Sequence, residues 1–72
     1  MSKDEQSRLL NQLKVRRAMK DMTQGALAEA IGVTRKSVNS IENGHFVPST
    51  ELALKMARVL ECTVEELFRL PE

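Results

Sequence analysis

The joint between two helical segments constrains this chain more than any other feature of its sequence. Thr23 is a good N-cap for a helix over 24–30, and Thr34 is a good N-cap for a second helix over 35–43. About three residues separate the two segments, and Gly32 among them suits the left-handed backbone that ends a helix. Two helices joined so closely cannot form a long antiparallel hairpin, so we expect them to cross steeply.

Capping residues and the helical spacing of apolar side chains divide the rest of the chain into further short helices. Ser49 caps one of them, and Thr63 with Glu66 forms the capping box of the last. Gly44 closes the helix before Ser49, and Pro71 ends the last one. No stretch alternates with period two for long enough to predict a strand. The predicted fold is all-α, with five helices over 4 or 7 to 20, 24–30, 35–43, 50–60 and a short one through 67 and 68.

The length of 72 residues fits one domain, which we place at 8–70 after a flexible or helix-extending segment at 1–7. A single cysteine allows no intrachain disulfide, as is usual in a reducing cytosol. With one Cys and one His the chain cannot form a zinc-finger type of metal site, and we expect no metal and no cofactor. The polar, partly acidic start is unlike a signal peptide, and no apolar run approaches the roughly 20 residues of a membrane span.

The residues around the joint also have the sizes that a steep crossing requires. Ala28 lies where a large side chain would hold the two helices apart, while Val38 and Ile41 give the second helix its packing face. The combined pattern is Gln24, Leu27, Ala28, Ile31, Gly32, Val33, Val38 and Ile41. Each residue is common alone, but the set at these spacings is specific. The alternative is a helical corner that binds no ligand.

The segment 24–44, QGALAEAIGVTRKSVNSIENG, resembles the helix-turn-helix of the Xre/lambda-repressor-like (Cro-type) family. Similarity continues through 48–49 and 52–68, so it covers about residues 8–70. The resemblance implies a compact five-helix domain, with the helix-turn-helix at about 24–43. It also implies that the third helix enters the DNA major groove and that a homodimer binds a palindromic operator. The chain departs from the family pattern at Gly25, at Arg16 and at Glu61 with Cys62, where many relatives have Gly-Val.

The outward face of the third helix carries hydrogen-bond donors and no acidic residue. At 100° per residue, Lys36, Asn39, Ser40 and Asn43 point away from the buried side, and Arg35 lies at its flank. Such donors suit base edges and phosphates. The candidates for base contact are Arg35, Lys36, Asn39 and Ser40, with Asn39 able to pair with adenine. The candidates for phosphate contact are Thr23, Gln24, Thr34, Ser37, Asn43 and His45.

Two opposite charges are predicted to face the same interior. Arg17 falls on the apolar stripe of the first helix, and Glu42 lies near the buried edge of the third. Matching positions in the family form a salt bridge, so the resemblance supports the same pair here. We therefore expect Arg17 and Glu42 to be a structural ion pair and not DNA contacts.

The leading hypothesis is a sequence-specific regulator of double-stranded DNA, acting as a repressor and a homodimer. The dimer surface is expected near the C-terminus, at Leu67, Phe68, Arg69 and Leu70. The chain is either a self-sufficient small repressor or the DNA-binding part of a longer protein. A helical protein-interaction module, antitoxin-like or cofactor-like, is the alternative from another class. RNA binding ranks third, because two Phe with no Trp or Tyr leave little surface for base stacking.

An enzyme ranks last. His45 could be a catalytic base, but the sequence places no nucleophile near it, and a loop histidine that touches backbone is favoured. Cys62 is favoured as a small buried hydrophobe over a redox sensor. Phe46 and Phe68 are expected in the core.

The formal net charge of +1 conceals an uneven distribution. Residues 8–36 carry seven basic and two acidic side chains, whereas residues 46–72 carry three basic and five acidic ones. The basic part covers the first helix through the start of the third. The small total charge therefore does not argue against DNA binding, although non-specific binding should be modest.

Overall fold

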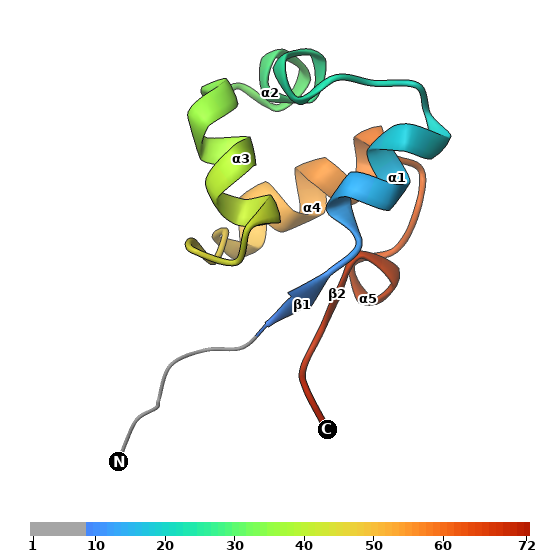
Figure 1. Ribbon diagram of the computed structural model, residues 1–72. Helices are drawn as coiled ribbons and strands as arrows, with labels where there is room; N and C mark the ends of the chain where they lie inside the picture. The colour runs from blue at the N-terminus through green and yellow to red at the C-terminus, as the bar shows by residue number, and fades with distance from the viewer. Residues whose placement is uncertain (1–8) are drawn as a thin grey trace.

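The computed structural model describes residues 9–72 and contains five short helices in a single core (Figure 1). The helices are α1 (Leu13–Met19), α2 (Gln24–Ile31), α3 (Arg35–Glu42), α4 (Thr50–Val59) and α5 (Val64–Leu67). The predicted all-α, five-helix class is confirmed. The segment predicted at 1–7 lies outside the described residues, as do the two expected starts of the first helix.

The ends of the described chain form a small sheet that the sequence did not predict. Strand β1 (Leu10–Asn11) pairs antiparallel with β2 (Phe68–Arg69), with Leu10 opposite Arg69 and Asn11 opposite Phe68 (Figure 1). Two expectations were therefore wrong. The first helix was expected to start at residue 4 or 7, but α1 begins at residue 13. The last helix was expected to run through residue 68 and to end at Pro71, but α5 ends at residue 67. Two-residue strands are too short to show an alternating pattern.

Asn11 gives a physical reason for the late start of α1. Its Oδ1 accepts a hydrogen bond from the Leu13 N–H at 3.0 Å, and its Nδ2 donates to the carbonyl of Ile41 at 3.1 Å. The Gln12 N–H donates to the carbonyl of Leu67 at 2.8 Å. These bonds fix an extended entry to the helix, because an asparagine side chain offers the backbone an alternative to helical bonding.

The core lies where α2 and α3 meet α1, α4 and α5. Its fully enclosed side chains are Leu13, Leu27, Val38, Ile41, Met56, Leu60 and Leu67. Leu67 is thus a core residue and not part of an exposed dimer surface, while Leu70 remains 80% exposed. Phe68 packs partly buried against this core, but Phe46 is 52% exposed, so its predicted core position was wrong. Phe46 follows the end of α3, in a loop that lies outside the core.

The turn residues adopt the expected backbone. Gly32 has φ 79° and Gly44 has φ 78°, the left-handed region that a side chain makes costly. Glu61 adopts the same region at φ 57°, which is costly for a residue that carries a side chain. Cys62, next to it, is half-buried against the core, and burial raises the pKa of its thiol. Within residues 9–72, no helix is long and apolar enough to cross a membrane.

Candidate nucleic-acid interface

Helix α3 sits at the edge of the fold, held by one face and open on the other (Figure 1). Val38 and Ile41 are buried, whereas Arg35, Lys36 and Asn39 are exposed. The predicted base-contacting residues therefore lie on the accessible side, with Ser40 half-buried beside them. The crossing angle between α3 and α2 is fixed, because the Gly32 turn leaves little conformational freedom and both helices are capped.

The caps of α2 and α3 occupy two of the predicted phosphate-contacting hydroxyls. Thr23 Oγ1 accepts a hydrogen bond from the Ala26 N–H at 3.0 Å, and Thr34 Oγ1 accepts from the Ser37 N–H at 3.1 Å. Thr34 and Ser37 also share a hydrogen bond between their hydroxyls, at 3.1 Å. A capping hydroxyl uses its oxygen as acceptor and keeps a proton to donate, so Thr23 can cap its helix and still meet a phosphate.

A shallow hollow of about 330 Å³ lies between α3 and the loop that follows it. Its lining residues are Thr34, Lys36, Ser37, Ser40, His45 and Phe46. The hollow thus brings together three of the predicted phosphate contacts and two of the predicted base contacts. Asn43 lies at the C-terminal cap of α3, exposed to solvent.

Arg17 and Glu42 face each other across α1 and α3. Arg17 Nε lies 2.5 Å from Glu42 Oε2, and Nη2 donates to Oε1 at 3.2 Å. The side chains are 13% and 6% exposed, so the pair is largely removed from water. Burial alone raises the pKa of Glu42, but hydrogen bonds from Arg17 and Gln24 outweigh it and leave that pKa below its ordinary value. The hydrogen bond to Glu42 raises the pKa of Arg17, so both groups stay charged.

Gln24 joins this pair instead of standing free for a phosphate. Its Nε2 donates to Glu42 Oε1 and to Asn39 Oδ1, each at 3.1 Å. An amide nitrogen has two protons to donate, and both have partners here. Phosphate contact by Gln24 stays a prediction, and it would have to use the backbone N–H at the start of α2.

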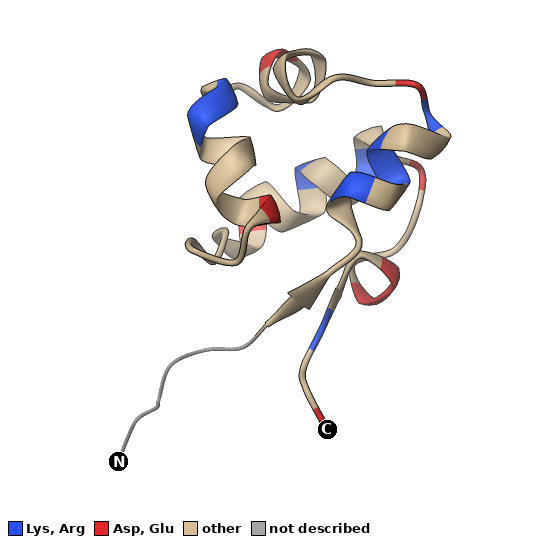
Figure 2. Cartoon of the chain, viewed as in Figure 1, with Lys and Arg blue, Asp and Glu red and all other residues tan. Residues whose placement is uncertain are grey.

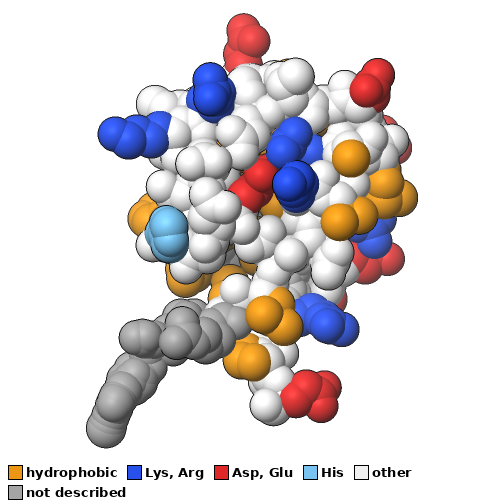
Figure 3. Space-filling view, in the orientation of Figure 1, with side chains coloured by type: hydrophobic (Ala, Val, Ile, Leu, Met, Phe, Trp, Pro, Cys, Tyr) orange, Lys and Arg blue, Asp and Glu red, His pale blue; other side chains and the backbone are white. Residues whose placement is uncertain are grey.

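Lys14 is a basic residue of this surface that the sequence reasoning missed. It is exposed on α1, and its positive charge helps to lower the pKa of Glu42 at the end of α3. The sequence feature that could have pointed to Lys14 is its position three residues before Arg17, because residues three apart lie on the same side of a helix. Basic residues accordingly occur on α1 and at the start of α3, while α5 is acidic (Figure 2). Figure 3 shows Lys and Arg side chains on the face formed by α1 and α3.

A short capped helix that presents Arg, Lys and Asn outward from a three-residue turn defines a helix-turn-helix DNA-binding domain. The helix-turn-helix family model matches residues 13–67 of this chain. The chain belongs to the Xre/lambda-repressor-like helix-turn-helix family of DNA-binding transcriptional regulators.

Relatives of known sequence or structure agree with this assignment. YgzD of Bacillus subtilis, an uncharacterized HTH-type transcriptional regulator, is 42% identical over 62 residues, which cover 86% of this chain and 94% of YgzD. The restriction-modification controller protein C.AhdI of Aeromonas hydrophila has a similar structure, with a TM-score of 0.70 and 31% identity over 75% of this chain and 82% of its own. The P22 c2 repressor, solved in complex with a synthetic operator, shares the fold with a TM-score of 0.71 and 24% identity, over 74% of this chain and 80% of its own.

Proposed function

We propose that this protein is a repressor that inserts α3 into the major groove and binds a palindromic operator as a homodimer. The observation that carries the proposal is the accessible face of α3, where Arg35, Lys36 and Asn39 lie exposed and no acidic side chain accompanies them. An α-helix fits the major groove, and these side chain types read base edges there. The P22 c2 repressor and its operator supply the analogy for the mode of binding. A regulator of this kind acts in the cytoplasm, where its DNA lies, and the proposal involves no catalytic step.

The contacts divide into base readout and positioning. We assign Arg35, Lys36, Asn39 and Ser40 to base edges. We assign Thr23, Thr34, Ser37, Asn43 and His45 to phosphates, together with the backbone N–H of Gln24. Lys14 joins the phosphate contacts, because it is exposed on α1 and its charge acts on Glu42 at the end of α3.

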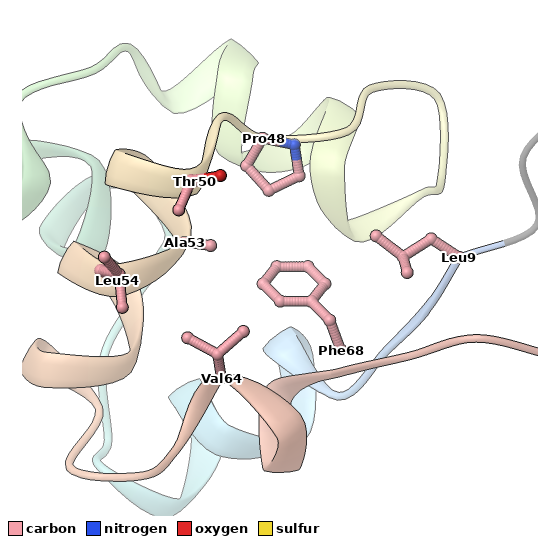
Figure 4. A pocket seen from close by; sticks show the side chains of 7 residues that line it. All are labelled: Leu9, Pro48, Thr50, Ala53, Leu54, Val64 and Phe68. Carbon is pink, nitrogen blue, oxygen red and sulfur yellow. The ribbon is translucent and has the colours of Figure 1, made fainter.

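Pairing of two chains follows from the size of the reading helix. An eight-residue helix contacts too few base pairs to select a site in a genome, and two copies reach half-sites about one helical turn apart. An apolar groove of about 390 Å³ supports this pairing (Figure 4). It is lined by Leu9, Pro48, Thr50, Ala53, Leu54, Val64 and Phe68, and none of these comes from α3. A second copy placed there would leave both reading faces open to DNA.

Selection from a pool of random duplex DNA at two salt concentrations tests the proposal. We expect a palindromic consensus and an affinity that falls steeply with salt, because contacts to phosphates release counterions. Recovery of no enriched sequence, together with salt-insensitive binding, would overturn it. Light scattering of the free and the DNA-bound protein tests the pairing. We expect Leu54→Lys to weaken dimer formation. A protein that binds DNA as a monomer would contradict the pairing.

A protein-interaction module remains the second candidate, and the same apolar groove is the observation that favours it. The two functions differ in the experiment above. A protein that stays monomeric and enriches no duplex, yet is well folded, would fit an interaction module and not a repressor.

A further inference from the structure

An aromatic side chain lies exposed beside α3, although the sequence predicted it in the core. Phe46 is 52% exposed, in the loop that follows α3. It lines the shallow hollow of about 330 Å³ together with Lys36 and Ser40 of α3 and with Thr34 and His45. A single exposed apolar side chain is ordinary on a protein surface. The exposure of Phe46 is informative because the ring lines a hollow of the candidate interface.

The hollow joins the two kinds of proposed DNA contact. Lys36 and Ser40 are assigned to base edges, whereas Thr34, Ser37 and His45 are assigned to phosphates. In the proposed complex the hollow therefore spans the boundary between the bases and the DNA backbone. The C5 edge of a pyrimidine lies on the backbone side of the major groove, and in thymine it carries a methyl group.

The lining of the hollow suits such an apolar group. Phe46 contributes an aromatic ring, and phenylalanine is one of the side chains that contact the thymine methyl group in the major groove. The hydroxyls of Thr34 and Ser37 are bonded to each other at 3.1 Å, and Thr34 Oγ1 also accepts from the Ser37 N–H. Both oxygens have a partner within the protein, so a methyl group that enters the hollow leaves neither of them unpaired.

We propose that Phe46 contacts the 5-methyl group of a pyrimidine, which enters the hollow when the protein binds its operator. The inference rests on the proposed function and adds a specificity-determining residue outside the reading helix. Thymine and 5-methylcytosine both supply the group, since both carry a methyl at C5. The hollow is larger than one methyl group, so it also has room for the deoxyribose of the same nucleotide.

Two competing roles for Phe46 make different predictions. A ring that packs only against a deoxyribose meets the same surface at every base pair, so its loss would weaken binding equally on all sequences. A ring that joins two copies of the chain would instead set the dimer population of the free protein. Contact with a methyl group predicts a loss of affinity only where that group is present.

Exchange of thymine for uracil tests the proposal, because uracil lacks only the methyl group. Each thymine in one half-site of the selected operator is replaced in turn, and affinity is measured for the wild type and for Phe46→Ala. We expect one thymine at which uracil weakens wild-type binding by about fourfold, the worth of one buried methyl group. At that position Phe46→Ala should reduce the ratio between the two duplexes to less than about twofold. Phe46→Leu keeps an apolar side chain and should keep most of the wild-type ratio.

Val47→Ala is the matched control variant. Val47 is the next residue along the chain, is equally exposed at 52% and does not line the hollow. Val47→Ala should therefore retain the wild-type ratio between the thymine and uracil duplexes. Thermal melting checks that each variant is folded, and light scattering measures its dimer population.

Cytosine duplexes identify the source of the methyl group. The thymine–adenine pair at the sensitive position is replaced by cytosine–guanine, with and without a methyl group at C5 of the cytosine. A gain in affinity on methylation, in the wild type but not in Phe46→Ala, would support contact with either methylated pyrimidine. A gain from the methyl group of thymine alone would support the contact for thymine only. A loss of affinity on methylation that disappears in Phe46→Ala would overturn the proposal, because the ring would then exclude the group.

Three further results would overturn the inference and leave the repressor assignment in place. These are a wild-type protein that binds uracil and thymine duplexes equally at every position, a ratio that is unchanged in Phe46→Ala, and a lower dimer population in free Phe46→Ala. If the wild-type protein enriches no duplex at all, the proposed function fails and the inference fails with it.

Discussion

The guanidinium of Arg17 on α1 forms an ion pair with the carboxylate of Glu42 at the end of α3, with Nε 2.5 Å from Oε2. The same guanidinium donates from Nη1 to the carbonyl of Met22 at 2.8 Å, just before α2 begins. One side chain thus ties α3 to both helices that precede it.

Replacing Arg17 with Met should destabilise the domain by about 3 kcal/mol, because a buried carboxylate would be left without its partner. Urea unfolding measures the change. Lys55→Met is the matched control. Lys55 meets Glu51 at 3.6 Å in an exposed pair, and loss of such a pair costs about 0.5 kcal/mol or less. Equal stability of the Arg17 variant and wild type, with weakened DNA binding, would mean that Arg17 is a DNA contact.

The stability that Glu42 contributes should depend on pH. Its pKa in the folded protein lies below the ordinary value of 4.5, so the unfolded chain binds a proton more readily than the folded one. The contribution is therefore complete above about pH 4.5 and is lost as the pH falls through the lower, folded pKa. The gap in unfolding free energy between wild type and Glu42→Gln should be widest near pH 7 and narrow in acid.

The exposed carboxylates Glu61 and Glu66 also have lowered pKa values, the first through Lys20 and the second through its capping bond with Thr63. Glu61 and Glu66 are present in both the wild type and Glu42→Gln. Their effects on the unfolding free energy therefore cancel when these two proteins are compared. A gap that is constant from pH 7 to pH 3 would contradict the account of Glu42.

The helical part of this fold was predictable because its signals are local. Thr23, Thr34, Ser49 and Thr63 each accept a hydrogen bond from a backbone N–H three residues on, as their spacing predicted. The terminal sheet was not predictable, because the pairing of Leu10 with Arg69 joins residues that only the tertiary fold brings together.

The outward face of α3 was predictable to a similar depth. The outward positions of Lys36 and Asn39 follow from helical geometry once Val38 and Ile41 are placed inside. The double contact of Gln24 was not foreseen, since it depends on the distance across two crossing helices. Lys14 was missed although it lies three residues before Arg17, because its closeness to Glu42 is set by how α1 packs near α3.

Two glycines should respond in opposite ways to substitution by alanine. Gly32 has a left-handed backbone, so Gly32→Ala should cost about 1 kcal/mol although no atom lies within 4 Å of the new Cβ. Gly25 lies in the first turn of α2, and its Cβ would meet Thr23 Oγ1 at an ordinary 3.8 Å. Gly25→Ala should therefore stabilise by about 0.5–1 kcal/mol through helix propensity. Thermal melting of both variants tests the pair, and changes of the same sign would contradict it.

Arg35→Ala and Lys36→Ala should weaken binding to the selected operator without unfolding the domain. A base contact should cost about 1–3 kcal/mol and relax one position of the consensus, and a phosphate contact should instead reduce the salt slope by about one. Because both side chains are exposed, unfolding free energies should stay within about 0.5 kcal/mol of wild type. Arg58→Ala, exposed on α4, is the charge-matched control. Loss of the fold in the α3 variants would mean that this face is buried.

Affinity for an operator with altered groove atoms tests the central claim most directly. Replacing the purines of each half-site with 7-deaza purines removes N7 from the major groove, while replacing guanine with inosine removes the amino group of the minor groove. If α3 reads the major groove, 7-deaza substitution should weaken binding about tenfold or more, and inosine should change it little. Loss of binding with inosine and none with the 7-deaza purines would contradict the account.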